Sequence, residues 1–348
     1  MKKIVFTGGG TAGHVYPIVA LLPYFKNYEI HYIGTNGMER GIISKCKGVI
    51  YHEIPAVKLV RKLTLKNLLI PFKLLSSIKK TKKVLREISP NVIFSKGGYV
   101  AVPVVLAGRR LGIPVVSHES DLSMGLANKI ILKKCNAMCT TFLETTKGRP
   151  KCIHTGQPIR QDILDGIACN IKNKFTNNNP VLLIIGGSLG ARFINQKITE
   201  NIDRLLQEFN VIHITGRGNL SEIERENYIQ IEFAERIADY YACADIVVSR
   251  AGSGVINELL YLRKPMLLIP LSKKCSRGDQ IENANLFKKL KYAEVIEEEQ
   301  WTNQLFFNKL NYLVKNKENI KQIMRQSAPN NANEKIVEII EKYAQRNN

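Results

Sequence analysis

Two glycine-rich segments contain the residue types that bind phosphate groups. Residues 7–14 (TGGGTAGH) and 186–191 (GGSLGA) each follow a short apolar run and precede an amphipathic stretch. Glycines let the backbone approach a phosphate closely, and the free N–H groups at the start of a helix attract negative charge. Ser188 could donate its hydroxyl to a phosphate oxygen, and Arg160 in GQPIRQD could clamp a pyrophosphate through two parallel hydrogen bonds. We therefore expect two anion-binding turns. Taken alone, a glycine segment could be a plain tight turn, and Arg160 could be an ordinary surface arginine.

A third glycine-rich turn has neighbours suited to a ribose and a sugar. Residues 249–258 (SRAGSGVINE) follow an apolar run and open a helical pattern, which places Glu258 in the second helical turn. A carboxylate there could accept two hydrogen bonds from a ribose diol, although a solvated glutamate is the usual alternative. Gln280 and Asn283, in SRGDQIENAN, lie near a predicted helix start and could bind sugar hydroxyls. This part of the chain therefore adds candidate ribose and sugar ligands to the two anion-binding turns.

Short apolar runs alternate with helical patterns along the whole chain, and this alternation positions the turns. Examples are KKIVFTG, NVIFSKGG and IPVVSHES in the first half, and PVLLIIGG, NVIHITG and ADIVVSRAG in the second. The alternation predicts parallel sheets with helices on both faces. The pattern restarts after the Asn-rich residues 170–180, and each half begins with a glycine turn. Since ligands bind beyond the carboxyl ends of such strands, we expect an α/β protein with two doubly wound Rossmann-like domains facing a central cleft.

Length, charge and cysteine content constrain the class of protein. A chain of 348 residues should hold two domains, and we expect a first domain over residues 1–157, a second over 158–325, and a helix over 326–348 that packs back on the first. The net charge of +21 is concentrated in the first 150 residues, which carry 24 Lys/Arg and 7 Asp/Glu. The seven cysteines lack metal-binding spacing, which indicates reduced thiols in the cytoplasm. No apolar run reaches the ~18 residues of a transmembrane helix, so we expect a soluble or peripheral protein.

Residues 57–86 are the most basic part of the chain. They hold ten Lys/Arg and no acidic residue, interleaved with leucine, isoleucine and valine. This composition is typical of an element that lies on an anionic membrane surface. A core helix with a solvated basic face is the alternative, and nucleic acid is disfavoured because the segment has one aromatic residue and no recognisable binding module. The candidate membrane residues are Lys58, Arg61, Lys62, Leu69, Ile70, Phe72, Leu75, Lys79 and Lys80.

Taken together, the motifs resemble those of the MurG family of glycosyltransferases over nearly the whole chain. Seven occur in the family's order: GGGTAGHVYP, SKGGYVAVPVV, HESDLSMGLANK, GQPIR, GGSLGA, SRAGSGVINE and RGDQIENAN. The resemblance implies a GT-B architecture, with UDP-N-acetylglucosamine held mainly by the second domain and a lipid-pyrophosphate acceptor by the first. It implies inverting transfer of N-acetylglucosamine to the 4-hydroxyl of the muramyl residue of lipid I, giving lipid II for peptidoglycan synthesis. It also implies a peripheral enzyme on the cytoplasmic face of the cell membrane that uses no metal or other cofactor. The implied acceptor is an undecaprenyl-linked muramyl-pentapeptide. The implied partners are other cell-wall synthesis proteins and do not include nucleic acid.

The resemblance also implies roles for individual residues. Two positions differ from much of the family, since Asp121 ends HESD where HEQN is common, and Leu189 stands in GGSLGA where GGSQGA is common. The residues carried over to the acceptor side are Thr11, Ala12, Gly13, His14 and Asn128. The residues carried over as donor ligands are Arg160, Ser188, Phe233, Ala234, Arg250, Gly252, Ser253, Gly254, Glu258 and Gln280.

The residues agree with a transfer reaction that needs no metal. The chain has no Asp-x-Asp pair, and the charge on departing UDP could be stabilised by two helix N-termini and Arg160. The acceptor hydroxyl needs a general base, for which the candidates are His14, Glu119 and Asp121, with His14 favoured. Two alternative functions stay open: a UDP-N-acetylglucosamine 2-epimerase, and a basic membrane or nucleic-acid-binding protein with an inactive cleft.

Overall fold

The computed structural model describes residues 1–56, 70–187, 190–327 and 331–345. The chain divides into two compact units, one formed by Met1–Arg160 with Asn331–Asn348 and the other by Gln161–Asn330. It therefore passes from the first unit to the second after Arg160 and returns before Asn331. The sequence predicts these crossings after residues 157 and 325. In the structure the first crossing comes three residues later, and Arg160 therefore belongs to the first unit and not to the second.

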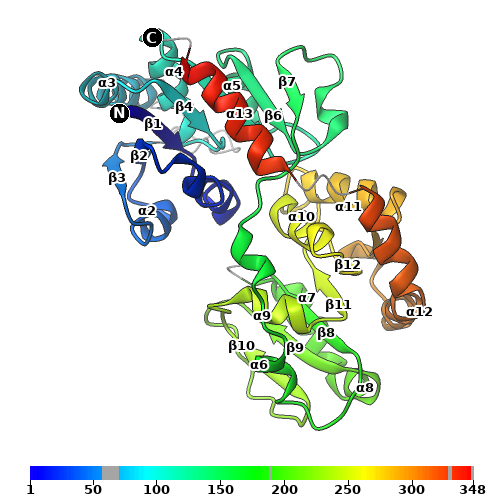
Figure 1. The fold of residues 1–348 in the computed structure, drawn as a ribbon. Helices are drawn as coiled ribbons and strands as arrows, with labels where there is room; N and C mark the ends of the chain where they lie inside the picture. The colour runs from blue at the N-terminus through cyan, green and yellow to red at the C-terminus, as the bar shows by residue number, and fades with distance from the viewer. Residues whose placement is uncertain (57–69, 188–189, 328–330, 346–348) are drawn as a thin grey trace. The chain divides into compact units, whose positions relative to one another are not determined.

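The first unit is built on a parallel sheet of seven strands within the described residues, in the order β3-β2-β1-β4-β5-β6-β7 (Figure 1). Ile4 of β1 pairs with Ile30 of β2 on one side and with Val92 of β4 on the other. The strand order reverses between β1 and β4, and ligands of such sheets bind at this switch point, beyond the carboxyl ends of the strands. The strands are β1 (Lys2–Thr7), β2 (Tyr28–Gly34), β3 (Val49–Glu53), β4 (Val92–Ser95), β5 (Val115–Glu119), β6 (Ala137–Thr140) and β7 (Cys152–His154).

Helices cover both faces of this sheet, so each face buries its own apolar cluster. One cluster includes Val5 and Val104, and the other includes Ile4 and Phe6. Successive residues of β1 therefore enter opposite layers, as the two-residue repeat of a strand requires. The first layer contains α3 (Ile70–Ile88), α4 (Ala101–Arg110) and α5 (Leu126–Leu132), and the second contains α1 (Tyr16–Val19), η2 (Leu22–Phe25), α2 (Met38–Ile43) and α13 (Ala332–Gln345).

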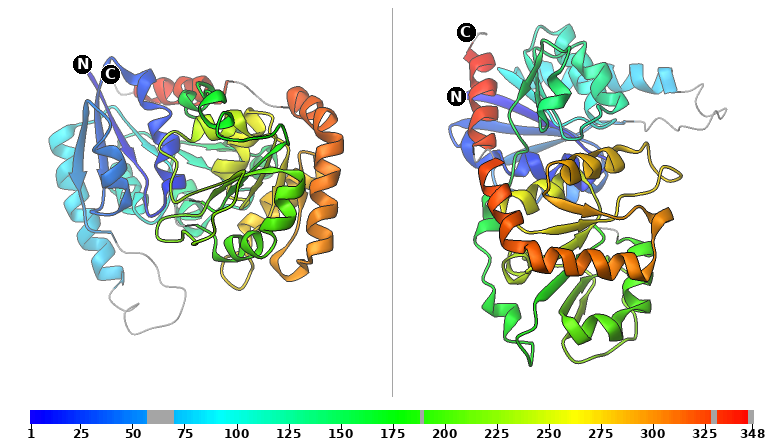
Figure 2. Two further views of the ribbon diagram at one scale, coloured as in Figure 1. Left: turned by 90° about the horizontal axis from the view of Figure 1, so that it is seen from below. Right: turned by 90° about the vertical axis from the view of Figure 1, so that its right-hand side faces the viewer.

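The C-terminal helix α13 packs on the first unit, although it follows the second unit in the sequence. Ile336 and Ile340 are buried in the same cluster as Phe6, and Figure 2 shows the helix, in red, on the first unit. The backbone of Ile159 and the side chain of Asn333 exchange hydrogen bonds of 3.1 and 2.9 Å. These contacts join the segment that leaves the first unit to the segment that returns to it.

The amphipathic stretch that follows the first glycine turn, residues 15–25, does not form one continuous helix as its helical pattern predicts. Residues 12–25 form three short pieces: η1 (Ala12–His14), α1 and η2. Pro17 and Pro23 lie in the first turns of α1 and η2, and a proline lacks the N–H group that a continuous helix needs. A helix of about one turn sums few peptide dipoles, so the first glycine turn lacks the positive helix end that we expected there.

The second unit repeats the architecture, with six parallel strands in its described part in the order β10-β9-β8-β11-β12-β13. Its switch point lies between β8 and β11, where Ile184 pairs with Val248. The strands are β8 (Val181–Ile185), β9 (Asn210–Ile214), β10 (Tyr228–Ile231), β11 (Ile246–Ser249), β12 (Met266–Leu268) and β13 (Ala293–Val295). The helices are η5 (Gln161–Leu164), α6 (Cys169–Lys172), α7 (Arg192–Glu200), α8 (Ile202–Glu208), α9 (Ile237–Cys243), α10 (Ser253–Tyr261), α11 (Asp279–Lys289), η6 (Glu298–Gln300) and α12 (Asn303–Ser327).

Both units are thus parallel α/β sheets with helices on their faces, and the predicted fold of two doubly wound Rossmann-like domains is confirmed. In the second unit the glycine turns lead from β8 to α7 and from β11 to α10, as predicted. Among the helices that the structure describes, none is both long enough and apolar enough to cross a membrane.

Candidate active site

Three loops of the first unit meet at the carboxyl ends of β1, β4 and β5. A Cβ atom added to Gly98 would lie 2.5 Å from the carbonyl oxygen of Gly9 and 3.4 Å from Nδ1 of His14. A Cβ atom added to Gly97 would lie 2.5 Å from Oδ1 of Asn128. Both glycines also have positive φ, so this turn accepts no larger residue without strain. The close packing brings His14 and Asn128, from separate motifs, to one end of the sheet.

His14 ends η1 and is partly exposed. Its Nδ1 atom lies 2.9 Å from Oγ1 of Thr11, the residue that precedes η1. In the tautomer that donates Nδ1–H to this hydroxyl, the lone pair is on Nε2, which is the form a general base requires. Thr11 therefore orients the ring of the favoured base. Ala12 and Gly13, the other predicted acceptor-side residues, form the rest of η1.

Glu119, an alternative candidate for the base, is buried and holds a loop together. Its Oε1 accepts the N–H of Asp121 at 3.0 Å, and its Oε2 accepts the N–H of Gly125 at 3.1 Å and Nδ2 of Asn128 at 3.0 Å. Burial, and after it the charge of Asp121, raise the pKa of Glu119. A carboxylate with three donors at 4% exposure is poorly placed to take a proton from a substrate. The geometry therefore disfavours Glu119 as the base and leaves Asp121, which is partly exposed, as the alternative to His14.

We expect Glu119→Gln to lower the free energy of unfolding by about 1–3 kcal/mol. An amide has one accepting oxygen, so at least one of the three N–H donors would face an NH2 group. Denaturant unfolding measures the change, and Glu144→Gln is a control because Glu144 is an exposed glutamate of the same unit, in η4 (Leu143–Thr146). A Glu119→Gln variant with unchanged stability and a large loss of kcat would instead return Glu119 to the list of candidate bases.

Asn128 is also buried, and the two polar atoms of its side-chain amide differ in their hydrogen bonding. Nδ2 donates to the carbonyl oxygen of His118 at 3.2 Å as well as to Glu119. Oδ1 accepts no hydrogen bond from the described residues. This side chain therefore shapes the loop after β5 and keeps one buried acceptor beside Gly97.

A buried lysine is the residue that sequence reasoning missed. Lys96 follows β4 and is 1% exposed; its Nζ donates to Nδ1 of His118 at 2.8 Å and to Oγ of Ser120. His118 in turn donates Nε2–H to the carbonyl oxygen of Gly156 at 2.9 Å. Burial lowers the pKa of Lys96 to about 8, against the opposing charges of Glu119 and Asp121. The signal was a lysine directly after an apolar strand, in the motif SKGGYVAVPVV, from which Lys96 was not selected as a candidate residue.

Arg160, the predicted pyrophosphate clamp, is the last residue of the first unit. Its Cζ lies 4.7 Å from the centre of the Tyr16 ring, within the range of a cation–π interaction. Tyr16 begins α1, just after His14. The stacking therefore places the guanidinium near the first glycine turn.

In the second unit, the turn before α10 leaves open space beside its backbone. Gly252 is the N-cap of α10 and Ser253 is its first residue. A Cβ atom added to Gly252 or Gly254 would meet no atom within 4 Å. Packing within the described residues therefore does not explain glycine at these two positions, whereas the close approach of a ligand would. Ser188, the predicted phosphate ligand of the preceding turn, lies outside the described residues.

The side chains around this turn are fixed by other elements of the second unit. Glu258, on α10, accepts a hydrogen bond of 3.1 Å from the hydroxyl of Tyr241. Gln280 accepts the N–H of Leu271 at 3.0 Å through its Oε1. Arg250 pairs with Glu298 and donates to two main-chain carbonyls, so its guanidinium is directed into the protein. Glu258 and Gln280 are thus held in place beside the turn, while Arg250 braces it.

The predicted uracil-side residues follow β10. Phe233 is 42% exposed, and Ala234 beside it is buried. The guanidinium of Arg217 lies 5.2 Å from the centre of the Phe233 ring. Arg217 was not among the residues selected from the sequence. The only feature that could have indicated it is its position in TGRGN, directly after β9.

The predicted membrane residues fall partly on α3. Phe72 and Leu75 are 69% and 57% exposed, and Lys79 and Lys80 are exposed as well, whereas Ile70 is partly exposed. Ile78, Leu85 and Ile88 of the same helix are buried in the core, so α3 has an apolar inner face and a basic outer face. Lys58, Arg61, Lys62 and Leu69 lie outside the described residues.

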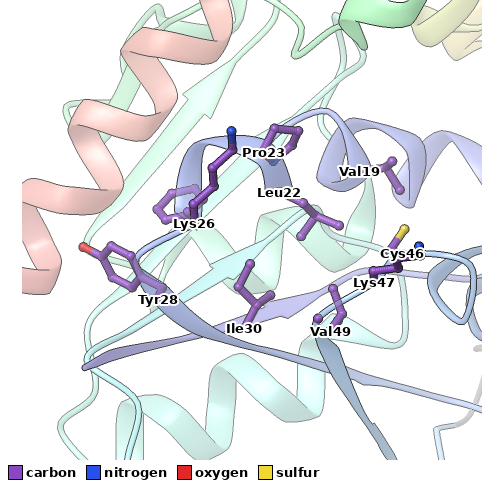
Figure 3. Close-up of a pocket in the computed structure, with 11 residues that line it drawn as sticks. Val19, Leu22, Pro23, Lys26, Tyr28, Ile30, Cys46, Lys47 and Val49 are labelled. Carbon is purple, nitrogen blue, oxygen red and sulfur yellow. The ribbon is translucent and has the colours of Figure 1, made fainter.

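A pocket on the first unit is separate from the candidate site. Val19, Leu22, Ile30 and Val49 line it, with lysines at its edge (Figure 3). None of the predicted catalytic or ligand-binding residues lines it. Within the described ranges, no three His, Cys, Asp or Glu side chains gather as potential metal ligands.

Known protein families and proteins match the chain over nearly its full length. The model of the glycosyltransferase family 28 N-terminal domain matches residues 4–140, and that of the family's C-terminal domain matches residues 181–342. A Clostridium tetani protein named UDP-N-acetylglucosamine--N-acetylmuramyl-(pentapeptide) pyrophosphoryl-undecaprenol N-acetylglucosamine transferase is 47% identical, with 98% of each chain covered. A Clostridium kluyveri protein of the same name is 48% identical, with 99% of this chain and 100% of that protein covered.

Solved structures match the fold. The crystal structure of Acinetobacter baumannii MurG superposes with a TM-score of 0.76 at 24% identity, covering 98% of this chain and 100% of that one. A UDP-GlcNAc 2-epimerase from Neisseria meningitidis, bound to UDP-GlcNAc, superposes with a TM-score of 0.66 at 16% identity, again over 98% and 100% of the two chains. At these identities the likeness shows a shared fold and does not by itself separate a transferase from an epimerase.

Proposed function

The chain belongs to the MurG enzymes of glycosyltransferase family 28, and from this premise we propose that it transfers N-acetylglucosamine from UDP-N-acetylglucosamine to an undecaprenyl-linked muramyl-pentapeptide. The observation that carries the proposal is the identity of 47% and 48% with transferases of that name over nearly the whole chain. The chain is therefore a hexosyltransferase of peptidoglycan synthesis. The epimerase and the non-catalytic protein that the sequence left open are not favoured.

We assign the donor to the second unit. The open space beside Gly252 and Gly254 suits a diphosphate, because the main-chain N–H groups at the start of α10 would point at it. Glu258, held by Tyr241, is positioned to accept hydrogen bonds from the ribose hydroxyls. Gln280 keeps its NH2 group for the sugar while its oxygen is engaged with Leu271. Phe233 and Ala234 would lie beside the uracil.

We assign the acceptor and the general base to the first unit. The acceptor's 4-hydroxyl would give its proton to Nε2 of His14 as its oxygen bonds to the anomeric carbon. The bond from that carbon to the UDP oxygen breaks at the same time, which inverts the anomeric configuration. UDP leaves with an additional negative charge, which the N-terminal ends of α7 and α10 and the guanidinium of Arg160 would stabilise. These groups supply the positive charge that a divalent cation supplies in other transferases.

A transfer assay tests this function directly. Labelled UDP-N-acetylglucosamine and a lipid-linked muramyl-peptide should yield a labelled disaccharide product, and we expect full activity in excess chelator. Strict dependence on magnesium or manganese would contradict the assignment of leaving-group stabilisation to Arg160 and the helix ends. Formation of UDP-N-acetylmannosamine without any lipid acceptor would instead identify an epimerase.

We expect Arg160→Ala to weaken UDP binding by about 1–3 kcal/mol, the range for leaving one hydrogen-bonding partner unsatisfied. Isothermal titration calorimetry with UDP measures the change. Arg204→Ala is a matched control, because Arg204 also stacks on an aromatic ring, that of Phe307, at 3.8 Å. Equal UDP affinity in wild type and Arg160→Ala would place the diphosphate elsewhere.

We further propose that the enzyme associates peripherally with the cytoplasmic face of the cell membrane through α3. Its lipid-linked acceptor resides in a membrane, so a surface that binds anionic lipid would bring the enzyme to its substrate. The exposed Phe72 and Leu75 could enter the interface while Lys79 and Lys80 contact lipid headgroups. Apolar and basic groups thus lie on the exposed side of one helix.

A further inference from the structure

The short helix η6, between β13 and α12, carries two neighbouring carboxylates that contact different loops of the second unit. Oε1 of Glu298 lies 2.6 Å from Nη2 of Arg250, in the turn after β11. Oε1 of Glu299 accepts a hydrogen bond from Oγ of Ser272, in the loop after β12. The first loop leads to Gly252–Gly254 and the second leads to Gln280. One element outside the predicted site thus contacts both loops that we assign to the donor.

Arg250 connects these two loops. Its Nη1 donates to the carbonyl oxygens of Ile269 at 3.1 Å and Pro270 at 3.3 Å, where β12 ends. The side chains of Arg250 and Glu298 are only 13% and 17% exposed, so this ion pair is far less screened than a surface pair. With Glu298 removed, a largely buried guanidinium would lose its only acidic partner among the described residues. The guanidinium therefore links the turn after β11 to the end of β12, and the ion pair with Glu298 holds the guanidinium in place.

Helix α11 also contacts the same two loops. Nδ2 of Asn283 donates to the carbonyl oxygen of Ala251 at 3.3 Å, and Asn283 is fully buried. Oε1 of Gln280 accepts the N–H of Leu271 at 3.0 Å. Figure 1 shows α10 and α11 close together in the second unit. Each loop is therefore contacted both by α11 and, directly or through Arg250, by a carboxylate of η6.

We propose that Glu298 and Glu299 are positioning residues for the UDP-sugar donor, acting through Arg250 and Ser272. They hold the turn at residues 251–254 and the loop at 271–278 in the shape that the donor requires. A binding group displaced by a fraction of an ångström loses much of its contribution, and a loop that must be ordered on binding costs affinity. The inference rests on the proposed function, because it assumes that the second unit binds the donor.

Glu298→Gln, Glu299→Gln and the control Glu297→Gln test the proposal in the full-length enzyme. Glu297 is the neighbouring glutamate that precedes η6, so the control removes the same charge from nearly the same place. We expect Glu298→Gln to raise the UDP dissociation constant about tenfold, the effect of losing one charged hydrogen bond. Glu299 is exposed, so Glu299→Gln should have a smaller effect in the same direction. Glu297→Gln should leave UDP binding unchanged, and the acceptor KM should change in none of the three.

Two further variants separate positioning from general stability. In the Arg250→Met background, Glu298→Gln should cause no additional loss of UDP affinity, because Glu298 acts through the guanidinium. Glu298→Asp keeps the charge and should recover part of the affinity lost in Glu298→Gln. Melting temperatures show whether each variant is folded, and Glu298→Asp remains informative if Glu298→Gln does not fold.

The experiment distinguishes failure of the proposed function from failure of the positioning role of Glu298 and Glu299. A wild-type chain that binds no UDP would overturn the proposed function itself. A wild-type chain that binds UDP, with Glu298→Gln and Glu297→Gln equal to it, would overturn only the positioning role. Additive losses in the Arg250→Met background would also overturn it, because Glu298 would then act independently of Arg250.

Discussion

Replacing His14 by glutamine should lower kcat by roughly 10²–10⁴-fold while leaving UDP affinity unchanged. Glutamine can still hydrogen-bond to Thr11, which lies 2.9 Å from Nδ1 of His14, but it cannot take a proton from the acceptor hydroxyl. Steady-state kinetics with varied acceptor, together with UDP titration, measure the two quantities separately. His154→Gln is a control, because His154 is an exposed histidine on β7 of the same unit.

Thr11 provides a second test of the same assignment. If Thr11 only orients the ring, Thr11→Val should reduce kcat by far less than His14→Gln does. A His14→Gln enzyme that keeps most of its kcat but has a raised acceptor KM would show that His14 binds the acceptor. Asp121 would then be the next candidate for the base, because Glu119 is buried among three donors.

Replacing Lys79, Lys80, Lys82 and Lys83 on α3 by glutamine should weaken binding to anionic vesicles by up to ~10³-fold. Each basic residue close to an anionic surface contributes about 1 kcal/mol, and this contribution declines as salt screens the charges. Vesicle sedimentation at several salt concentrations measures the affinity. UDP binding should be unchanged, since none of these four lysines is among the proposed donor ligands.

A matched control separates a local membrane surface from overall net charge. Replacing Lys172, Lys174, Lys288 and Lys289, four exposed lysines of the second unit, removes the same total charge. This variant should keep most of its vesicle affinity. Equal affinity of the wild-type enzyme for neutral and anionic vesicles, or equal losses in both variants, would contradict the assignment to α3. Phe72→Ser tests the apolar part of the interaction, which salt should not weaken.

The two parallel sheets could be predicted from the sequence because their strands are short, uninterrupted apolar runs. Residues 181–185 (VLLII) are all buried, as expected for a central strand covered by helices on both faces. The turn before α10 could also be predicted from the sequence, because an apolar run, a glycine turn and a helical pattern follow one another at residues 246–261. These features depend on neighbours in the chain, so local sequence determines them.

The helix expected after the first glycine turn shows where local patterning is insufficient. The apolar residues between 15 and 25 have helical spacing, and Val15, Ile18 and Leu21 are buried as that spacing suggests. Pro17 and Pro23 nevertheless divide the segment into separate turns. Burial of the apolar residues against the sheet is compatible with several short turns, so the pattern identified the buried face without identifying a continuous helix.

The direction of polar side chains was decided by the tertiary structure alone. Arg250 was expected at the donor, yet its partners are Glu298 and the main chain of Ile269 and Pro270, which are distant in the sequence. Lys96 is an ordinary lysine in the sequence, and it is buried because His118 and Ser120, on the neighbouring strand and its loop, supply its acceptors. A buried polar group must find a partner, and the fold determines which partners are within reach. The amino-acid sequence was therefore sufficient to predict the family, the two sheets and the glycine turns, whereas the folded chain decided which protein groups hold Arg250 and Lys96.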